Sequence, residues 1–264
     1  MPLAIKGWAS GSLMQVSVFK SILQGKTMDL FYIENFHPEN TVISLSSEEL
    51  HHISKVLRKN AGSPISLTDG NGYLISGEIA DIRKQQLTVT VKKIQKFDFP
   101  VQNQLTLGVA VIRPNRMDWI VEKATELGLK TIVPLICKNN SYKNIKTMHL
   151  RKITISAMKQ SQQMYLPEIK APMPLEYWLE ENPDSFKSSY VADPDGNFGP
   201  PGDSISPVLL PCRVVIGPEG GFTDQELQLA GKLGFSRLRL GNTILRTETA
   251  AVAAIAILKS AAAL

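Results

Sequence analysis

The sequence has few cysteines and histidines and no long apolar run. It holds two cysteines, Cys137 and Cys212, and four histidines among 264 residues. Neither cysteine has a Cys or His neighbour at metal-ligand spacing, which argues against a disulfide scaffold or a zinc site and predicts no bound metal. No run approaches the roughly 18 apolar residues of a membrane span. We therefore expect a globular protein of a reducing compartment, the cytoplasm, without a membrane partner.

Two common nucleotide-binding patterns are also missing. The glycines of Gly217–Gly221 lack the dinucleotide-binding spacing, and no Lys-Ser or Lys-Thr follows them as in a phosphate loop. What is present is a pair of glycine-bearing segments, Val214–Leu227 and Leu238–Ala251, each predicted as strand, loop and capped helix. Bare-backbone loops at the ends of adjacent strands suit a flat, polar small molecule. The alternative for each is a plain strand–helix turn.

Charge is unevenly spread, although the net charge is only +5. From Phe99 to Lys170 there are eleven Lys or Arg against four acids, whereas from Ala171 to Leu264 there are seven against eleven. The stretch Leu127–Pro167 contains no acid. Clustered cations displace the counterions of nucleic acids, so this stretch predicts a phosphate-facing surface. A solvated basic face is the alternative.

The pattern divides the chain into three stretches. Residues 1–27 have no periodicity and lead to Met28, so we expect a leader or tag that is disordered. Residues 28–98 predict short strands and one helix over Glu49–Arg58, forming a small, mostly antiparallel barrel. In residues 99–264 strands and helices alternate, which predicts a parallel sheet covered by helices on both faces.

The expected elements of the third stretch follow from its apolar runs and from the Gly, Pro and capping residues between them. The predicted strands are Leu105–Ile112, Thr131–Ile136, Tyr190–Ala192, Val214–Ile216 and Leu238–Leu240. The predicted helices are Asp118–Leu127 with a cap at Gly128, Leu150–Met164, a helix after Thr223 whose capping box uses Glu226, and Ala250–Leu264 with Thr247 or Thr249 as its cap. The segment Asp193–Pro211 is predicted as a long loop, which is typical of functional segments.

Three charged side chains are candidates for chemistry. Arg246 stands among apolar neighbours, and it either pairs with an acid such as Glu219 or Glu248 or reaches a substrate. Glu122 and Glu126 lie four apart on one helix face, where like charges cost about 0.2–0.5 kcal/mol. These two acids are either solvated or hold a nearby cation: Lys123, Arg113 or Arg116. The buried side of the helix is predicted to carry Trp119, Ile120, Ala124 and Leu127.

Four separate motifs resemble those of one family. The segments Ile216–Phe222 and Leu240–Ala250 are similar to the bacterial 16S ribosomal RNA uridine-N3 methyltransferases, the RsmE family. Arg116–Gly128 resembles the family's upstream motif and His51–Arg58 its N-terminal motif. Gln160-Ser161 and Leu166–Ile169 resemble the intervening motif. The resemblance covers about Met28 to Leu264, and four matches in the family's order make it specific.

The resemblance implies an α/β fold: a PUA-like RNA-binding barrel before a SPOUT-type parallel sheet with a C-terminal trefoil knot. It also implies a homodimer that uses S-adenosylmethionine to methylate N3 of a uridine in 16S ribosomal RNA of the small subunit. The Ala-rich C-terminal helix would pack in the knot and against the partner subunit. The cofactor pocket carried over from the family comprises Ile216, Gly217, Pro218, Glu219, Gly220, Leu240, Gly241, Ile244, Leu245 and Arg246.

The implied reaction needs help at the acceptor nitrogen. Uracil N3 carries a proton at neutral pH, so transfer requires either a general base or stabilisation of the uridine anion. Arg246 is predicted to stabilise the anion, and Glu122 or Glu126 to act as the base. The residues expected to contact RNA are His52, Arg58, Arg113, Arg116, Lys143, Arg151, Lys152 and Lys159.

The chain departs from the family pattern in the region expected to face RNA. Lys159 stands where Glu is usual, Gln163 where Arg is usual, and Asn139–Lys143 where a segment rich in Lys or Arg is usual. The cofactor loops show no such departure. Two alternatives stay open: a SPOUT methyltransferase acting on another base or on transfer RNA, and a non-catalytic RNA-binding or ribosome-assembly protein.

Overall fold

A computed structural model of the chain describes residues 29–46, 48–51, 53–54, 57–84, 86–181, 183–198 and 208–262. The chain forms two compact units, with the boundary between Asp98 and Phe99. The expected leader, residues 1–27, lies outside the described residues, and so does His52.

The first unit is built on a five-stranded sheet. Its strands are β1 (Leu30–Tyr32), β2 (Val42–Ser46), β3 (Pro64–Thr68), β4 (Tyr73–Ile82) and β5 (Gln86–Lys96), in the order β1-β3-β4-β5-β2. The pairing of β1 with β3 is parallel and the other pairings are antiparallel. Alternation along β5 buries Leu87 and Val89 in the core of this unit, as expected for a strand with one face on the core. The prediction of short, mostly antiparallel strands is confirmed.

The helix of the first unit is shorter than predicted. The helix α2 covers Glu48–His51, whereas the prediction extended to Arg58. Arg58 has a φ angle of +52°, a left-handed conformation that an α-helix does not contain. The predicted end of this helix is therefore wrong.

The second unit contains a seven-stranded sheet whose pairings are all parallel. Its strands are β6 (Leu105–Ala110), β7 (Thr131–Ile136), β8 (Glu168–Ile169), β9 (Met173–Pro174), β10 (Ser188–Phe198), β11 (Cys212–Ile216) and β12 (Ser236–Arg239). The order is β12-β10-β11-β6-β7-β8, and β9 also pairs with β7. The predicted parallel sheet is confirmed. Strand order does not test the trefoil knot, which stays a prediction.

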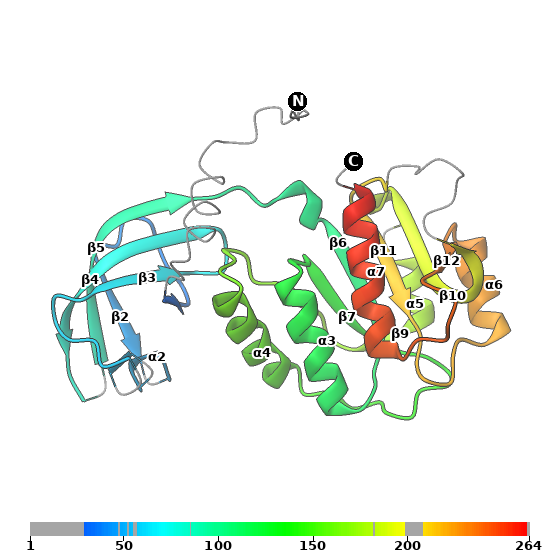
Figure 1. The fold of residues 1–264 in the computed structure, drawn as a ribbon, viewed down its shortest axis with the longest axis horizontal. Helices are drawn as coiled ribbons and strands as arrows, with labels where there is room; N and C mark the ends of the chain where they lie inside the picture. The colour runs from blue at the N-terminus through cyan, green and yellow to red at the C-terminus, as the bar shows by residue number, and fades with distance from the viewer. Residues whose placement is uncertain are drawn as a thin grey trace, which may run out of the picture. The chain divides into compact units, whose positions relative to one another are not determined.

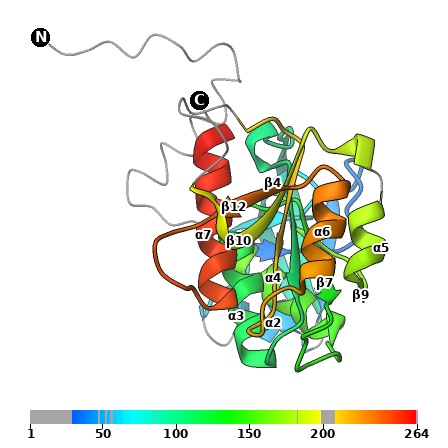
Figure 2. The same cartoon turned by 90° about the vertical axis from the view of Figure 1, so that its right-hand side faces the viewer.

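Helices cover both faces of this sheet, as Figures 1 and 2 show. One face carries α3 (Pro114–Glu126), α4 (Thr147–Gln160) and α7 (Thr247–Ala262), and the other carries α5 (Leu175–Glu180) and α6 (Asp224–Lys232). Successive residues of a strand point to opposite faces. Val214 accordingly belongs to the core under α3 and α7, and Val215 to the core under α5 and α6.

Helix ends differ from the predictions by a few residues. The helix α3 begins at Pro114, where the missing amide proton costs nothing, and Gly128 follows with the predicted positive φ, +72°. The helix α4 ends at Gln160, before the predicted Met164, and Gln162 has a φ of +56°. The capping box between Thr223 and Glu226 is confirmed.

The segment predicted as a long loop from Asp193 to Pro211 is partly a strand. Residues up to Phe198 continue β10, and the pairing with β12 shifts register between Ala192 and Asn197. Residues 199–207 lie outside the described residues. In the part of the chain that the structure describes, no helix has both the length and the apolar character to cross a membrane.

Candidate functional site

The two glycine-bearing segments lie at one edge of the parallel sheet. They follow β11 and β12, the strands on either side of β10. Since parallel strands end at the same edge, the loops after them meet, which is where ligands bind in open α/β sheets. The loops and the irregular part of β10 enclose a cavity of about 500 Å³, within the range of roughly 300–1,000 Å³ for small-molecule sites.

The structure brings the residues predicted for the cofactor pocket together around this cavity. All of them line it except Gly220. Most of the lining residues are glycine, proline or apolar residues, and Ile244 among them is 90% exposed. Such a lining suits a flat group held between apolar side chains and read by main-chain atoms.

Close packing fixes the first loop where it leaves β11. A Cβ atom on Gly217 would lie 3.0–3.2 Å from ring atoms of Phe222, so a larger residue would require the ring to shift by a few tenths of an ångström. The hydroxyl of Thr247 donates to the main-chain oxygen of Gly217 at 3.0 Å. Thr247, predicted as a possible cap, is instead the first residue of α7, and its side chain joins that helix to the loop.

Strand β10 also contributes to the cavity, through residues of the predicted long loop that were not among the predicted site residues. Asp193, Pro194 and Asp195 line the cavity where the strand loses its register. The Asp193 side chain is 6% exposed; its Oδ1 accepts from the Asp195 amide at 3.1 Å, and its Oδ2 lies 3.2 Å from Arg237 Nε. An Asp-Pro-Asp-Gly run directly after the predicted strand Tyr190–Ala192 is the pattern that identifies this position.

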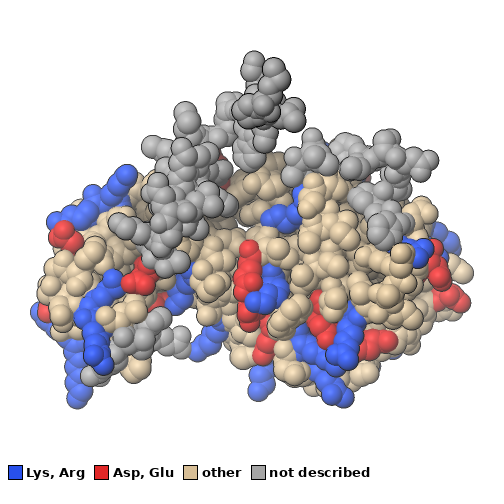
Figure 3. Space-filling view, in the orientation of Figure 1, with Lys and Arg blue, Asp and Glu red and all other residues tan. Residues whose placement is uncertain are grey.

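Glu219, which lines the cavity, and Glu248 pair with Arg116 rather than with Arg246. Arg116 Nη1 lies 3.4 Å from Glu219 Oε1, and its Nε lies 3.7 Å from Glu248 Oε1. Figure 3 shows acidic and basic side chains close together around the ends of α3 and α7. Arg246 is exposed and lines the cavity, and it makes no ion pair with any described residue. Its guanidinium is therefore available to a ligand.

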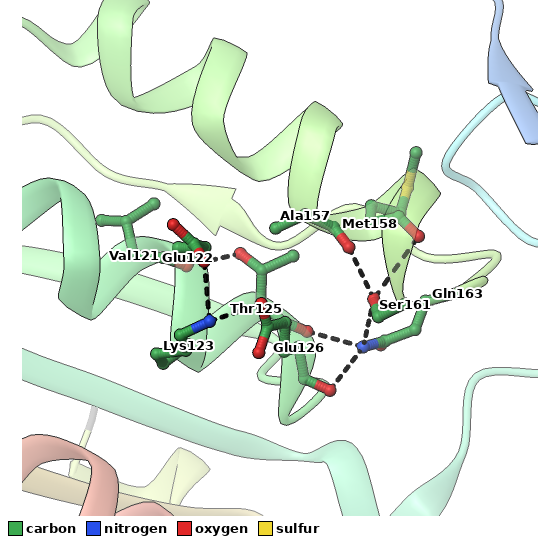
Figure 4. A network of polar contacts seen from close by, with 9 residues as sticks. All are labelled: Val121, Glu122, Lys123, Thr125, Glu126, Ala157, Met158, Ser161 and Gln163. Carbon is green, nitrogen blue, oxygen red and sulfur yellow. Dashed lines mark hydrogen bonds and ion pairs between the residues drawn. The ribbon is translucent and has the colours of Figure 1, made fainter.

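Glu122 and Glu126 lie elsewhere on α3 and do not line the cavity. Lys123 Nζ lies 2.7 Å from Glu122 Oε1 and 2.8 Å from Glu126 Oε1 (Figure 4). Hydrogen bonds to these two carboxylates raise the pKa of Lys123. Ile120 and Ala124 are buried as predicted, whereas Trp119 is 41% exposed, so its expected burial is wrong.

Gln163, which stands where the resemblance leads us to expect arginine, binds the end of α3 (Figure 4). Its Nε2 lies 2.6 Å from the main-chain oxygen of Thr125, 2.9 Å from that of Glu126 and 3.2 Å from Ser161 Oγ. The last carbonyls of a helix lack partners within the helix. Gln163 supplies a donor to two of them and joins α3 to the segment after α4.

The residues predicted to contact RNA are spread over both units. Arg58 is exposed in the first unit. In the second, Arg113 directly precedes α3, which carries Arg116, and Lys143 precedes α4, which carries Arg151, Lys152 and Lys159. Arg113, Lys143, Arg151 and Lys152 are exposed, and Lys159 and Arg116 are half-buried. Among the described side chains, no three or more His, Cys, Asp or Glu gather as a metal site.

Comparison with known proteins identifies the family. Residues 99–259 match the model of an RNA methyltransferase domain, and residues 45–92 match that of an RNA methyltransferase PUA domain. A protein of Buchnera aphidicola called ribosomal RNA small subunit methyltransferase E is 32% identical over 246 residues, covering 90% of this chain and 95% of that protein. This chain belongs to the ribosomal RNA small subunit methyltransferase E family.

Solved structures agree with membership of the methyltransferase E family. A probable rRNA-methyltransferase of Porphyromonas gingivalis has a TM-score of 0.80 at 30% identity, over 89% of this chain and 99% of that one. A ribosomal RNA small subunit methyltransferase E of Neisseria gonorrhoeae, bound to S-adenosyl methionine, has a TM-score of 0.79 at 27% identity, over 88% of this chain and 97% of that one. The predicted α/β fold with a PUA-like first unit is confirmed, as is the family that the motifs indicated.

Proposed function

We propose that this chain transfers a methyl group from S-adenosylmethionine to N3 of a uridine in 16S ribosomal RNA of the small subunit. One observation carries the proposal: in a member of the methyltransferase E family, both glycine segments close around a single cavity at the edge of the sheet. The related Neisseria protein holds S-adenosyl methionine.

The cavity fits this donor chemically. Ile216, Leu240 and Ile244 offer apolar surface to an adenine ring, and the glycine loops offer main-chain donors and acceptors to its edge. Asp193 and Asp195 bring negative charge to the wall, which suits a ligand that carries a sulfonium and an ammonium group. When bound, S-adenosylmethionine supplies an electrophilic methyl group that needs no further activation.

Arg246 acts on the acceptor in this proposal. Its guanidinium, exposed at the cavity, stabilises negative charge on O2 or O4 of the uracil. This charge favours loss of the N3 proton to water, and the freed nitrogen then accepts the methyl group. Arg116 cannot replace Arg246 in this role without leaving Glu219 and Glu248. Glu122 and Glu126 are held by Lys123 away from the cavity, so we assign them no part in the step.

The decisive experiment is methylation of small subunits that lack the modification. The wild-type protein should produce 3-methyluridine, detected by nucleoside mass spectrometry. Arg246→Ala should lower the rate about 10²–10³-fold, the usual cost of one charge-stabilising donor. Lys187→Ala is the control, because Lys187 is exposed beside the amino end of β10, at the opposite edge of the sheet from the cavity.

Each other outcome has a definite meaning. If Arg246→Ala methylates at the wild-type rate, Arg246 does not stabilise the charge on the uracil. A different methylated nucleoside points to a SPOUT enzyme with another target. If calorimetry detects RNA binding but no binding of S-adenosylmethionine, the chain is a non-catalytic RNA-binding protein.

We also infer that the protein works in the cytoplasm as a homodimer through α7 and α3. Outward positions of α7 carry small side chains, Thr249, Ala256 and Ser260, which allow another helix to approach closely. The neighbouring α3 exposes Trp119, and a large exposed aromatic residue is typical of interfaces. Sedimentation analysis should find a dimer for the wild type and a monomer for Ala256→Glu. A monomeric wild type would contradict the inference.

A further inference from the structure

Asn139 binds the first glycine loop without itself lining the cavity. Its Nδ2 lies 3.2 Å from the main-chain oxygen of Gly220 and 3.1 Å from that of Gly221. A Cβ atom on Gly220 would lie 3.1 Å from Asn139 Cβ, so the two residues are in direct contact. Neither Asn139 nor Gly220 lines the cavity, whereas Gly217, Glu219 and Gly221 do.

The residue before Asn139 fixes the helix that follows the same loop. The Lys138 amide donates to Glu226 Oε1 at 2.9 Å. Glu226 is 3% exposed and completes the capping box of α6, accepting from the Thr223 amide at 2.7 Å. Two consecutive residues after β7 therefore hold both the glycine loop and the first turn of α6.

The segment that carries Asn139 is itself well anchored. Asn140 Oδ1 accepts from the Cys137 amide at 3.2 Å, and Asn140 Nδ2 donates to the main-chain oxygens of Val111 at 3.1 Å and Tyr142 at 3.0 Å. These bonds join the turn after β7 to the residue that follows β6. Asn139 thus reaches the glycine loop from a support that belongs to the centre of the sheet.

We propose that Asn139 is a positioning residue for the methyl donor. The inference deepens the proposed function and rests on it. Glycine has more backbone freedom to lose than any other residue, so a loop with Gly217, Gly220 and Gly221 is costly to order when a ligand binds. The Asn139 amide orients two consecutive carbonyls, and with them the peptide groups that face the cavity. It therefore lowers the ordering cost that binding must meet.

The test compares Asn139→Asp and Asn139→Ala in the full chain by titration calorimetry with S-adenosylmethionine. A carboxylate faces the two carbonyl oxygens with like partial charge, so Asn139→Asp should weaken binding about 5- to 30-fold. Asn139→Ala should weaken it less, since it removes the bonds without repulsion. Asn144→Asp is the matched control, because it makes the same change at an exposed position of the same segment, and its affinity should equal that of the wild type.

Kinetics and melting separate positioning from a general role in folding. We expect the KM for S-adenosylmethionine to rise with the dissociation constant, while kcat at saturating donor changes less than about twofold and the melting temperature of the free protein by less than about 2 °C. Unchanged affinity for S-adenosylmethionine in both Asn139 variants would overturn the proposal. A melting temperature so low that partial unfolding explains the weaker binding would also overturn it. A wild-type protein that binds no S-adenosylmethionine would overturn the proposed function itself, and this inference with it.

Discussion

Arg213 is a fully buried cation whose partners are main-chain oxygens, the Ser189 hydroxyl and aromatic rings. It is 1% exposed, and its guanidinium donates to the main-chain oxygens of Trp178, Leu179 and Glu181 at 3.1–3.2 Å. Its guanidinium carbon also lies 4.4 Å from the ring centre of Phe235. Burial lowers the pKa of Arg213 to about 10, which still leaves it charged at neutral pH. One side chain thus satisfies the free carbonyls at the end of α5.

We expect Arg213→Met to cost about 2–4 kcal/mol of unfolding free energy, because it leaves buried carbonyls without donors. Urea unfolding followed by circular dichroism measures this loss. Lys187→Met, at an exposed position near the start of β10, should change stability by less than about 0.5 kcal/mol. A similar small change in Arg213→Met would show that water replaces the missing donors.

The two cysteines provide a test by pH. Burial raises the pKa of Cys212 to about 12, and burial together with Glu226 raises that of Cys137. Unfolded thiols ionise near pH 8.5, so the unfolded state loses protons first. The free energy of unfolding should therefore fall as the pH rises from about 8.5 towards 12.

At pH 8.5 a disulfide reagent should react with both thiols only after denaturant is added. Rapid reaction of the native protein would contradict this burial.

At the scale of elements, the end of α3 depends on the side chain of Gln163. We expect Gln163→Glu to lower stability by about 1–2 kcal/mol, since a carboxylate would face the carbonyls of Thr125 and Glu126 and oppose the helix dipole. Gln163→Arg is the control, because a guanidinium donates to the same oxygens and should preserve stability. Thermal melting of the three proteins measures the difference. A melting temperature of Gln163→Glu equal to that of the wild type would show that Gln163 does not stabilise the end of α3.

Sequence patterns predicted the strands and long helices well because each has a periodic apolar face. The run Thr131–Ile136 is a strand over its predicted length, and the capping box at Thr223 marks the start of α6. The six-residue α5 was missed, since so short a helix shows little period. The extension of β10 beyond Ala192 was missed because Asp, Pro and Gly resemble a loop, whereas the strand pairs with β12 again at Asn197 and Phe198 after a register shift.

The site was partly predictable for the same physical reasons. Glycines between a strand and a capped helix indicated the two loops. The partner of Glu219 was not predictable, because Arg116 lies 103 residues away in sequence and meets it only after the sheet forms. The contact of Asn139 with Gly220 likewise depends on the crossing of two loops.

At the scale of the whole molecule, basic side chains on α4 should govern affinity for RNA. We expect the double variant Arg151→Glu with Lys152→Glu to weaken binding to ribosomal RNA and to flatten its salt dependence by about 0.7–0.9 in log–log slope for each phosphate that is no longer neutralised. Affinity for S-adenosylmethionine should not change, since neither residue lines the cavity. Lys187→Glu is a control that makes one charge reversal of the same kind outside α4. An unaltered salt slope in the double variant would place the RNA elsewhere.

Every residue that lines the cavity lies between Ala192 and Ala250, after both α3 and α4 in the chain. During synthesis, the ribosome has therefore already released the basic helix before any donor pocket exists. A nonsense codon between the end of α4 and Leu238 removes at least the lining that the second glycine segment supplies, yet leaves the α4 cations in the product. Such truncated chains would keep the basic charge of α4 and lose the pocket, unlike those of an enzyme whose site is dispersed along its sequence.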